Sequence, residues 1–236
     1  MKSFNITSTI PVLIFIILCL TGCESTDTVD DLFYYNNTKN FDNINFHKSE
    51  EYVNTRLKRV LLLPFTIKTH RDKVVNEVTN AFYIELQKSA KFDILVPQGF
   101  QDILSQQQDI WNRGLIRAET IVEAKKRYKV DAIIFGTITQ YHPYEPPILG
   151  IKVGMFSANS GNIMWSSDAI FDSSEASVIK LIKTYHREHY QKHQSLYDWK
   201  IIPLSTKRYA QFVAHYMVES LKSKKTLWET FFHSTR

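Results

Sequence analysis

Cysteine is scarce in this chain of 236 residues, which contains only Cys19 and Cys23. Both lie close to the N-terminus. The rest of the chain therefore offers no thiol for nucleophilic catalysis, for a disulfide or for a cysteine-ligated metal site.

Glycine is also scarce, with 7 residues. None of them cluster into a dinucleotide-binding or Walker-type phosphate loop, and no G-x-S-x-G elbow for serine hydrolysis occurs. Gly150 and Gly154 lie in an expected strand, where glycine indicates a bulge or close packing. Carboxylates such as Asp131, Glu145 and Asp168 are scattered, so no acid/base pair is predicted. We expect neither an enzymatic activity nor a cofactor.

The N-terminus has the order of a secretory signal: Lys2 is followed by an almost purely apolar stretch from Ile10 to Leu20. This stretch is shorter than the roughly 20 apolar residues that a membrane-spanning helix needs. It ends in Leu20-Thr21-Gly22-Cys23, which resembles the lipobox of bacterial lipoproteins. The resemblance implies that residues 1–22 are a signal peptide and that Cys23 is the lipidated first residue of the mature chain. A signal peptide cut elsewhere, or an uncleaved anchor, is the alternative.

The lipobox resemblance also implies partners and a location. Cys23 would carry three acyl chains, palmitate among them, and several chains bind a membrane durably where one binds only marginally. Glu24 follows the cysteine where an aspartate would favour the inner membrane. We therefore expect an outer-membrane lipoprotein that faces the periplasm, with membrane lipid as one partner and other cell-envelope proteins as further partners.

Residues 23–55 are polar and show no sustained period, which is typical of a tether between lipid and domain. The aromatic cluster from Leu32 to Tyr35 interrupts this segment, and it is expected to dock on the chain's own domain, with docking on a partner as the alternative. The formal net charge of +5 is modest and spread along the chain. No nucleic-acid partner is expected from it.

Residues 56–221 are predicted to form one periplasmic α/β domain, in which a mixed sheet carries helices on at least one face. Strands are expected in the apolar runs and at a hairpin around Asn159-Ser160-Gly161, and helices at the segments with helical spacing of apolar residues. The expected strands are 57–65, 92–97, 130–139, 148–157 and 163–171. The expected helices are 72–90, 100–111, 118–128, 175–193 and 206–221.

Three stretches of this domain resemble a known group of envelope domains. They are the opening strand from Arg59 to Phe65, the strand from Val130 to Ile138, and the hairpin from Asn159 to Trp165. They are similar to the N-terminal domain of TolB and to the related domains of the curli secretion lipoprotein CsgG and the penicillin-binding-protein activator LpoB. The resemblance implies a TolB N-terminal-like fold and a role in binding envelope proteins or in assembly, without catalysis. No pair of long pore-forming hairpins is evident, which disfavours a secretion channel.

Three histidines are the one constellation that suggests metal chemistry. His186, His189 and His193 are spaced so that they share one helical face, and neutral imidazoles there could bind zinc. Their spacing is not that of zinc proteases, and the neighbouring Arg187 and Lys192 disfavour a cation. No metal site is assigned, and a metal-dependent envelope enzyme using this face is kept as an alternative.

Two aromatic segments are further candidates for binding. Residues 222–236 form a basic and aromatic tail that would either lie on a membrane or partner, or fold back on the domain. The Tyr141 to Pro147 loop either offers a rigid contact surface for a small molecule or glycan, or only turns the chain between strands. The sequence as a whole predicts a lipid-anchored accessory or assembly factor of an envelope complex, with the glycan binder and the metal enzyme as alternatives.

Overall fold

The computed structural model describes residues 44–68, 72–97, 117–190 and 197–222. The chain divides into two compact units, residues 1–40 and 41–236, and every described residue belongs to the second. The strands are β1 (Asn45–Lys48), β2 (Arg59–Leu62), β3 (Thr66–Ile67), β4 (Asp93–Leu95), β5 (Ala132–His142), β6 (Ile148–Ser157) and β7 (Ile163–Asp172). The helices are α3 (Glu50–Asn54), α4 (Asp72–Ser89), α7 (Ala118–Tyr128), α8 (Ala176–Tyr190), the short 3₁₀ helix η2 (Asp198–Ile201) and α9 (Thr206–Lys222).

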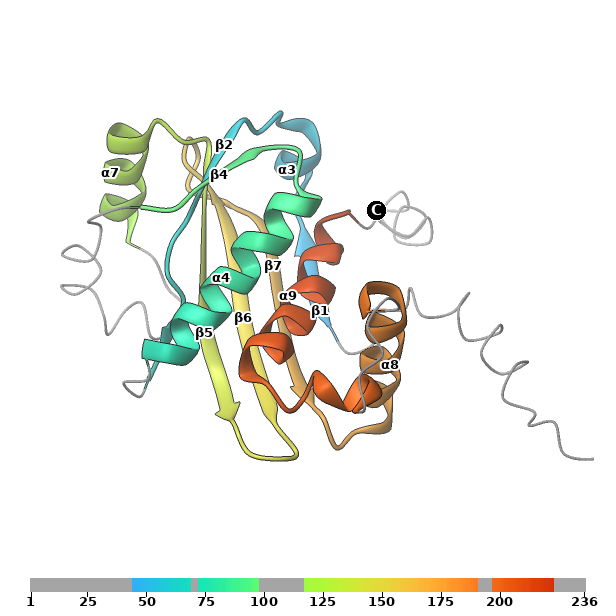
Figure 1. Cartoon of the computed structure of the whole chain (residues 1–236). Coiled ribbons are helices and arrows are strands. Elements are labelled where there is room, and N and C mark those ends of the chain that lie inside the picture. Colours follow the sequence, from blue (N-terminus) through green and yellow to red (C-terminus); the bar gives the residue numbers. More distant parts are fainter. Residues whose placement is uncertain (1–43, 69–71, 98–116, 191–196, 223–236) are drawn as a thin grey trace, which may run out of the picture. The chain divides into compact units, whose positions relative to one another are not determined.

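The strands form one mixed sheet in the order β1-β7-β6-β5-β2-β4, and β3 pairs with β5 (Figure 1). β2 runs parallel to β4 and β5, whereas β5, β6, β7 and β1 are successively antiparallel. The parallel half needs crossover connections, and α4 supplies the one between β2 and β4. The antiparallel half is built from the β5–β6 and β6–β7 hairpins. The turn residues Asn159-Ser160-Gly161 predicted the second hairpin.

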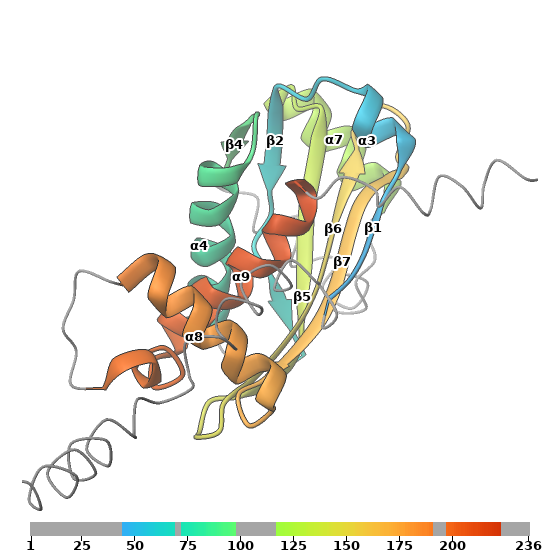
Figure 2. The same cartoon turned by 90° about the vertical axis from the view of Figure 1, so that its right-hand side faces the viewer.

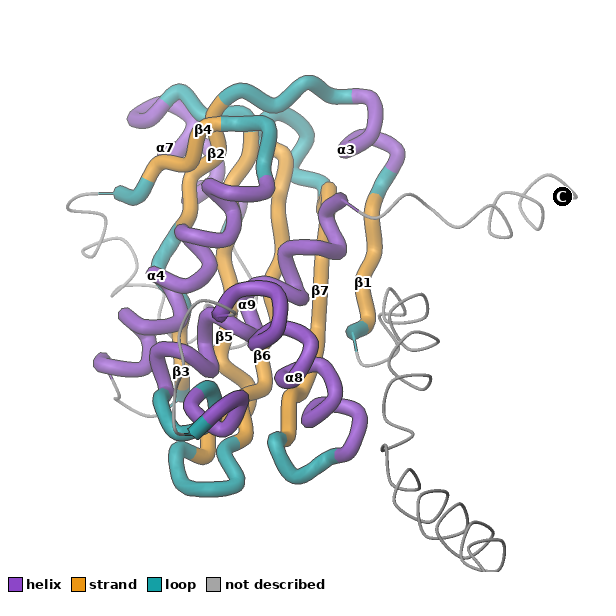
Figure 3. Tube along the Cα trace, turned by 45° about the vertical axis from the view of Figure 1, so that its right-hand side comes forward, coloured by secondary structure: helices purple, strands orange, loops and turns teal. Residues whose placement is uncertain are grey.

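Helices cover both faces of the sheet. Figure 2 shows the sheet close to edge-on, with α4, α8 and α9 in front of one face and α7 behind the other. The tube in Figure 3 shows the same three helices crossing the strands on their common side. Each face has its own buried apolar cluster: a large one beneath α4, α8 and α9, and a smaller one beneath α7. The predicted α/β class with a mixed sheet and packed helices is confirmed.

Strand β2 and the residue after it contribute side chains to both faces of the sheet. Val60 and Leu62 belong to the large cluster, whereas Leu61 and Leu63 belong to the small one. All four are fully buried. Successive side chains of a strand point to opposite faces, so only a continuous apolar run supplies both clusters. The prediction of a strand buried on both faces is confirmed.

A close contact links two of the stretches on which the family resemblance rests. Phe65, just after β2, packs against Phe82 of α4 with ring centroids 4.6 Å apart. The same ring lies over Gly136 in β5, where an added Cβ would come within 2.3 Å of Phe65 Cε1. The glycine is required because the phenylalanine occupies the space that a side chain would fill.

The folded domain begins earlier than the predicted boundary at residue 56. β1 and α3 lie inside the stretch that we assigned to the linker, yet β1 pairs with β7 from Asn45 opposite Asp168 to Lys48 opposite Trp165. Ile44 is buried in the large cluster. The sequence of β1 shows no alternation of apolar and polar residues. β1 is the edge strand of the sheet, and three of its four side chains are exposed. Its pairing uses backbone groups, which a hydrophobic pattern does not reveal.

The other predicted elements agree with the structure to different extents. α4, α7 and the β6–β7 hairpin match the predicted segments within one residue at each end. η2 was not predicted, and the helix expected at 100–111 lies outside the described residues. Among the helices that the structure describes, none is long and apolar enough to cross a membrane.

Candidate ligand-binding pocket

A pocket of about 1000 Å³ opens where the first and last described elements of the domain meet. It lies between β1 and α3, the segment that leads into β2, the C-terminal end of α4 with the following turn, and the end of α9. The described residues that line it are Lys48, Tyr52, Val53, Thr55, Arg56, Leu57, Ser89, Ala90, Lys91, Phe92, Leu221 and Lys222. Four of them are basic and none is acidic.

Lys48 holds one wall of this pocket together. Its Nζ donates a hydrogen bond of 3.0 Å to the backbone oxygen of Leu221, in the last turn of α9. The last carbonyls of a helix have no partner inside the helix, and a cation there also favours the helix dipole. Burial lowers the pKa of Lys48 below its ordinary value. The edge strand is thereby tied to the C-terminal helix by a charged hydrogen bond.

Tyr52 shapes the floor of the pocket and is positioned by a helix cap. The side chain of Ser49 accepts a hydrogen bond of 3.3 Å from the backbone N–H of Tyr52, which begins α3. The Lys48 ammonium lies 5.8 Å from the centre of the Tyr52 ring. Burial raises the pKa of Tyr52, so the phenol stays protonated at neutral pH.

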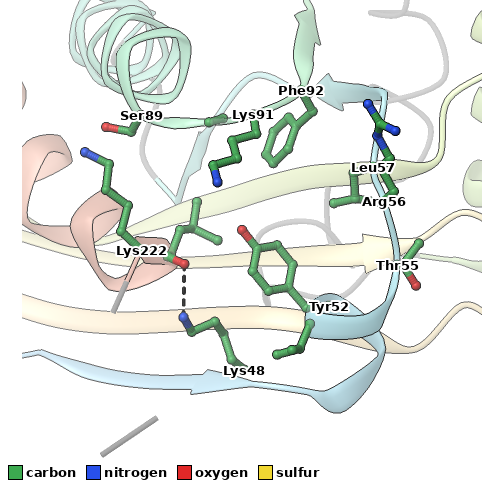
Figure 4. Close-up of a pocket in the computed structure, with 12 residues that line it drawn as sticks. Lys48, Tyr52, Thr55, Arg56, Leu57, Ser89, Lys91, Phe92 and Lys222 are labelled. Carbon is green, nitrogen blue, oxygen red and sulfur yellow. Dashed lines mark hydrogen bonds between the residues drawn. The ribbon is translucent and has the colours of Figure 1, made fainter. Parts of the chain in front are cut away.

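Three further cations surround the same space. Lys222 pairs with Glu219 one turn earlier on α9. Within the ranges that the structure describes, neither Arg56 nor Lys91 has an ion-pair partner. Figure 4 shows Lys91 and Lys222 extending into the space between the ends of α4 and α9, with the rings of Tyr52 and Phe92 facing it and Arg56 at the rim. The arrangement combines positive charge with an apolar and aromatic wall.

The histidine face predicted as a metal alternative is taken up by internal contacts. His186 Nδ1 lies 3.4 Å from Asp198 Oδ1, and its ring stacks on Tyr190. His189 Nδ1 lies 3.0 Å from the backbone oxygen of Tyr185 and stacks on that ring. His193 lies outside the described residues. Over the described ranges, no group of three or more histidine, cysteine, aspartate or glutamate side chains is placed to hold a metal ion.

A buried carboxylate pairs with another histidine, His215 of α9. Glu85 of α4 accepts from Lys88 Nζ at 2.8 Å and lies 3.2 Å from His215 Nδ1. Burial alone would raise the pKa of Glu85, but the hydrogen bonds from His215 and Lys88 and their charges lower it below its ordinary value. This cluster pairs α4 with α9 and has the character of a structural ion pair.

The remaining sequence candidates fall in different places. The Tyr141 to Pro147 segment closes the β5–β6 hairpin, with Tyr144 exposed and a cis peptide bond before Pro146. It turns the chain between strands, which was one of its two predicted roles. Cys23 and residues 223–236 of the predicted tail lie outside the described residues, and only Lys222 of that tail is placed.

The pocket residues were missed because they come from three separated parts of the sequence, residues 48–57, 89–92 and 221–222. Lys48, Tyr52 and Thr55 lie in the segment taken as linker, and Lys91 follows a helix where a basic residue has an ordinary role. One signal was available: Ser49-Glu50-Glu51 has the composition of a helix N-terminus. It would have revealed α3, although not the pocket.

Comparisons with known proteins leave the function open. No protein-family model matches the chain, and no curated protein matches it by sequence. Among solved structures, a PelC dodecamer from Paraburkholderia phytofirmans is similar with 9% identity, covering 77% of this chain and 98% of that chain at a TM-score of 0.47.

Two other solved structures are similar to this chain, and the first of them is named as a lipoprotein. Lipoprotein GNA1162 from Neisseria meningitidis has 14% identity, coverage of 57% of this chain and 99% of that chain, and a TM-score of 0.39. The LpoB C-terminal domain from Salmonella enterica has 14% identity, coverage of 50% and 86%, and a TM-score of 0.36. All three scores are below 0.5, so function has to be inferred from the residues of this chain.

Proposed function

We propose that this protein is a bacterial outer-membrane lipoprotein that acts without catalysis, as an accessory or assembly factor of an envelope complex. The observation that carries the proposal is Leu20-Thr21-Gly22-Cys23 directly after the apolar stretch that ends at Leu20. Cys23 would carry the acyl chains, and the domain that begins near Ile44 would face the periplasm. The acyl chains would confine the domain to the membrane surface.

The shortened linker changes the reach that this proposal assigns to the domain. Because β1 begins at Asn45, about twenty residues separate Cys23 from the fold, where the sequence suggested about thirty. A segment of that length can span at most about 70 Å, at roughly 3.3–3.6 Å per residue. A partner would have to lie within that layer, and confinement raises its effective concentration there.

The anchoring step is tested by metabolic labelling with radioactive palmitate in a Gram-negative host. The full-length chain should incorporate label, and Cys23→Ser should abolish it. Cys19→Ser is the matched control, because it removes the other cysteine within the apolar stretch and should leave labelling intact. Equal labelling of the Cys23→Ser variant would contradict the proposal.

The accessory role is tested by crosslinking in intact cells followed by purification of the tagged chain. The proposal expects a defined set of envelope proteins that is lost when Cys23→Ser prevents acylation of the chain. Recovery of the same partners with the unanchored variant would show that tethering is not what brings them together.

A further inference from the structure

The pocket beside α3 has a charge that its structural surroundings do not balance. Two helix C-termini border it, those of α4 and α9, and together they correspond to about one negative charge. Glu219 provides one more by pairing with Lys222. Against these stand Lys48, Arg56, Lys91 and Lys222. About two positive charges therefore remain without a fixed counter-charge among the described residues.

The helix ends explain only part of this cluster. Lys48 and Lys222 lie at the last turn of α9, where a cation has a structural role. Arg56 precedes β2 and Lys91 precedes β4, and neither forms an ion pair among the described residues. Like charges that line one cavity repel each other, and an anion bound between them replaces that repulsion by attraction. Arg56 and Lys91 are thus the residues that indicate a ligand.

The side chains that line the pocket favour one class of anion over another. The basic groups come from separate elements of the wall, which Thr55 and Ser89 also line. A tetrahedral phosphate accepts hydrogen bonds from several directions, whereas a carboxylate presents two oxygens in one plane. A guanidinium binds phosphate bidentately and an ammonium binds it as a point charge. A wall with basic groups on several elements therefore favours phosphate.

The rest of the wall is apolar. Leu57 and Leu221 are buried, and the rings of Tyr52 and Phe92 face the cavity. A volume of about 1000 Å³ exceeds what a bare inorganic anion fills and lies at the upper end of the range of ordinary ligand sites. The ligand should therefore carry an organic body beside its phosphate.

We infer that this pocket binds a phosphate ester of net negative charge, with the phosphate held by Arg56 and Lys91 and the organic body packed against Tyr52 and Phe92. A phospholipid headgroup and a soluble sugar or glycerol phosphate share this chemistry. The inference does not depend on lipidation of Cys23, since the pocket is built within the folded domain.

The test is calorimetric titration of the full-length protein after its N-terminal processing in the host cell, purified in a neutral detergent. The probes are short-chain dihexanoyl phosphatidylglycerol, glycerol 3-phosphate and dihexanoyl phosphatidylcholine. We expect saturable binding of at least one of the first two at one per chain, weakening as salt is raised. Phosphatidylcholine should bind at least tenfold more weakly, because the basic wall repels its trimethylammonium group.

The two anionic probes distinguish the source of the ligand. Tighter binding of phosphatidylglycerol supports a lipid headgroup, and equal or tighter binding of glycerol 3-phosphate supports a soluble ester. Saturable binding of neither, or equal binding of phosphatidylcholine, would overturn the inference.

The variants assign the binding to this pocket. Arg56→Gln with Lys91→Gln should weaken binding at least tenfold. The matched control is Lys125→Gln with Lys126→Gln, which removes two exposed charges from α7 on the other face of the sheet. Both pairs involve exposed side chains, so both proteins should fold, and circular dichroism checks this. Equal loss of binding in the two double variants would show a nonspecific charge effect and contradict the assignment.

Discussion

Substitution of Ser220 by alanine should destabilise the domain measurably, although it removes a single oxygen. Ser220 lies in α9 and accepts a hydrogen bond of 2.9 Å from the indole Nε1 of Trp165 in β7. Both residues have an exposed fraction of 0%. The alanine variant leaves the indole N–H buried with its acceptor removed, and an unsatisfied buried donor costs about 1–3 kcal/mol. The hydroxyl also donates to the Met217 carbonyl at 2.6 Å.

The higher helix propensity of alanine offsets a small part of this cost. Alanine is favoured over serine within a helix by up to about 0.5 kcal/mol. The expected net loss is therefore about 0.5–3 kcal/mol, which corresponds to a fall in Tm of about 1–12 °C for a domain of this size. Urea denaturation followed by circular dichroism gives the free energy of unfolding, and a thermal scan gives the Tm.

A double-mutant cycle isolates the hydrogen bond from other effects of Ser220→Ala. In a Trp165→Phe background no indole N–H exists, so Ser220→Ala should then cost about nothing. An unchanged Tm for the single variant, or the same loss in both backgrounds, would refute the reasoning that this hydrogen bond fastens α9 to the sheet.

Three further predictions follow from buried contacts. Gly136→Ala should cost about 1–3 kcal/mol in urea denaturation, because the added methyl group collides with the buried ring of Phe65; a neutral effect would show that the ring moves aside freely. Glu85→Gln should lower the free energy of unfolding at pH 7, and its difference from the unsubstituted protein should shrink as pH falls below 4.5. The reason is that a carboxylate whose pKa is lowered by folding stabilises the folded state above its unfolded pKa, and this stabilisation is lost on acidification. A constant difference from pH 7 to pH 3 would contradict this prediction. Lys48→Met should cost about 1 kcal/mol by removing the hydrogen bond to the carbonyl of Leu221, and the relief of a buried charge should offset part of the loss. A variant as stable as the parent would show that this hydrogen bond does not stabilise the packing of the edge strand against α9.

The elements of the fold that the sequence predicted best are those with a buried apolar pattern. Val60 to Leu63 had to be a central strand because four consecutive apolar side chains supply two clusters. α7 was predicted at its observed bounds, since Ile121 and Ala124 repeat at helical spacing between polar residues. In these segments local pattern and tertiary packing require the same structure.

The elements that the sequence did not predict are held by backbone pairing or by single contacts. β1 has only Lys48 buried, and its other three side chains are exposed at the edge of the sheet. The pocket depends on bringing this strand beside the ends of two helices distant in sequence, one reaching Ser89 and the other Lys222. No spacing within one segment records such a juxtaposition. The histidine face was visible in the sequence, but its contacts with Asp198 and Tyr185 come from the tertiary structure.

The central proposal, a domain held at a membrane through Cys23, is tested most directly by mass spectrometry of the protein isolated from cell membranes. The account predicts that its first residue is Cys23 and that the N-terminal peptide is heavier by a thioether-linked diacylglycerol and an amide-linked acyl chain. An N-terminal peptide with an unmodified thiol at Cys23, or one that still contains residues 1–22, would contradict it.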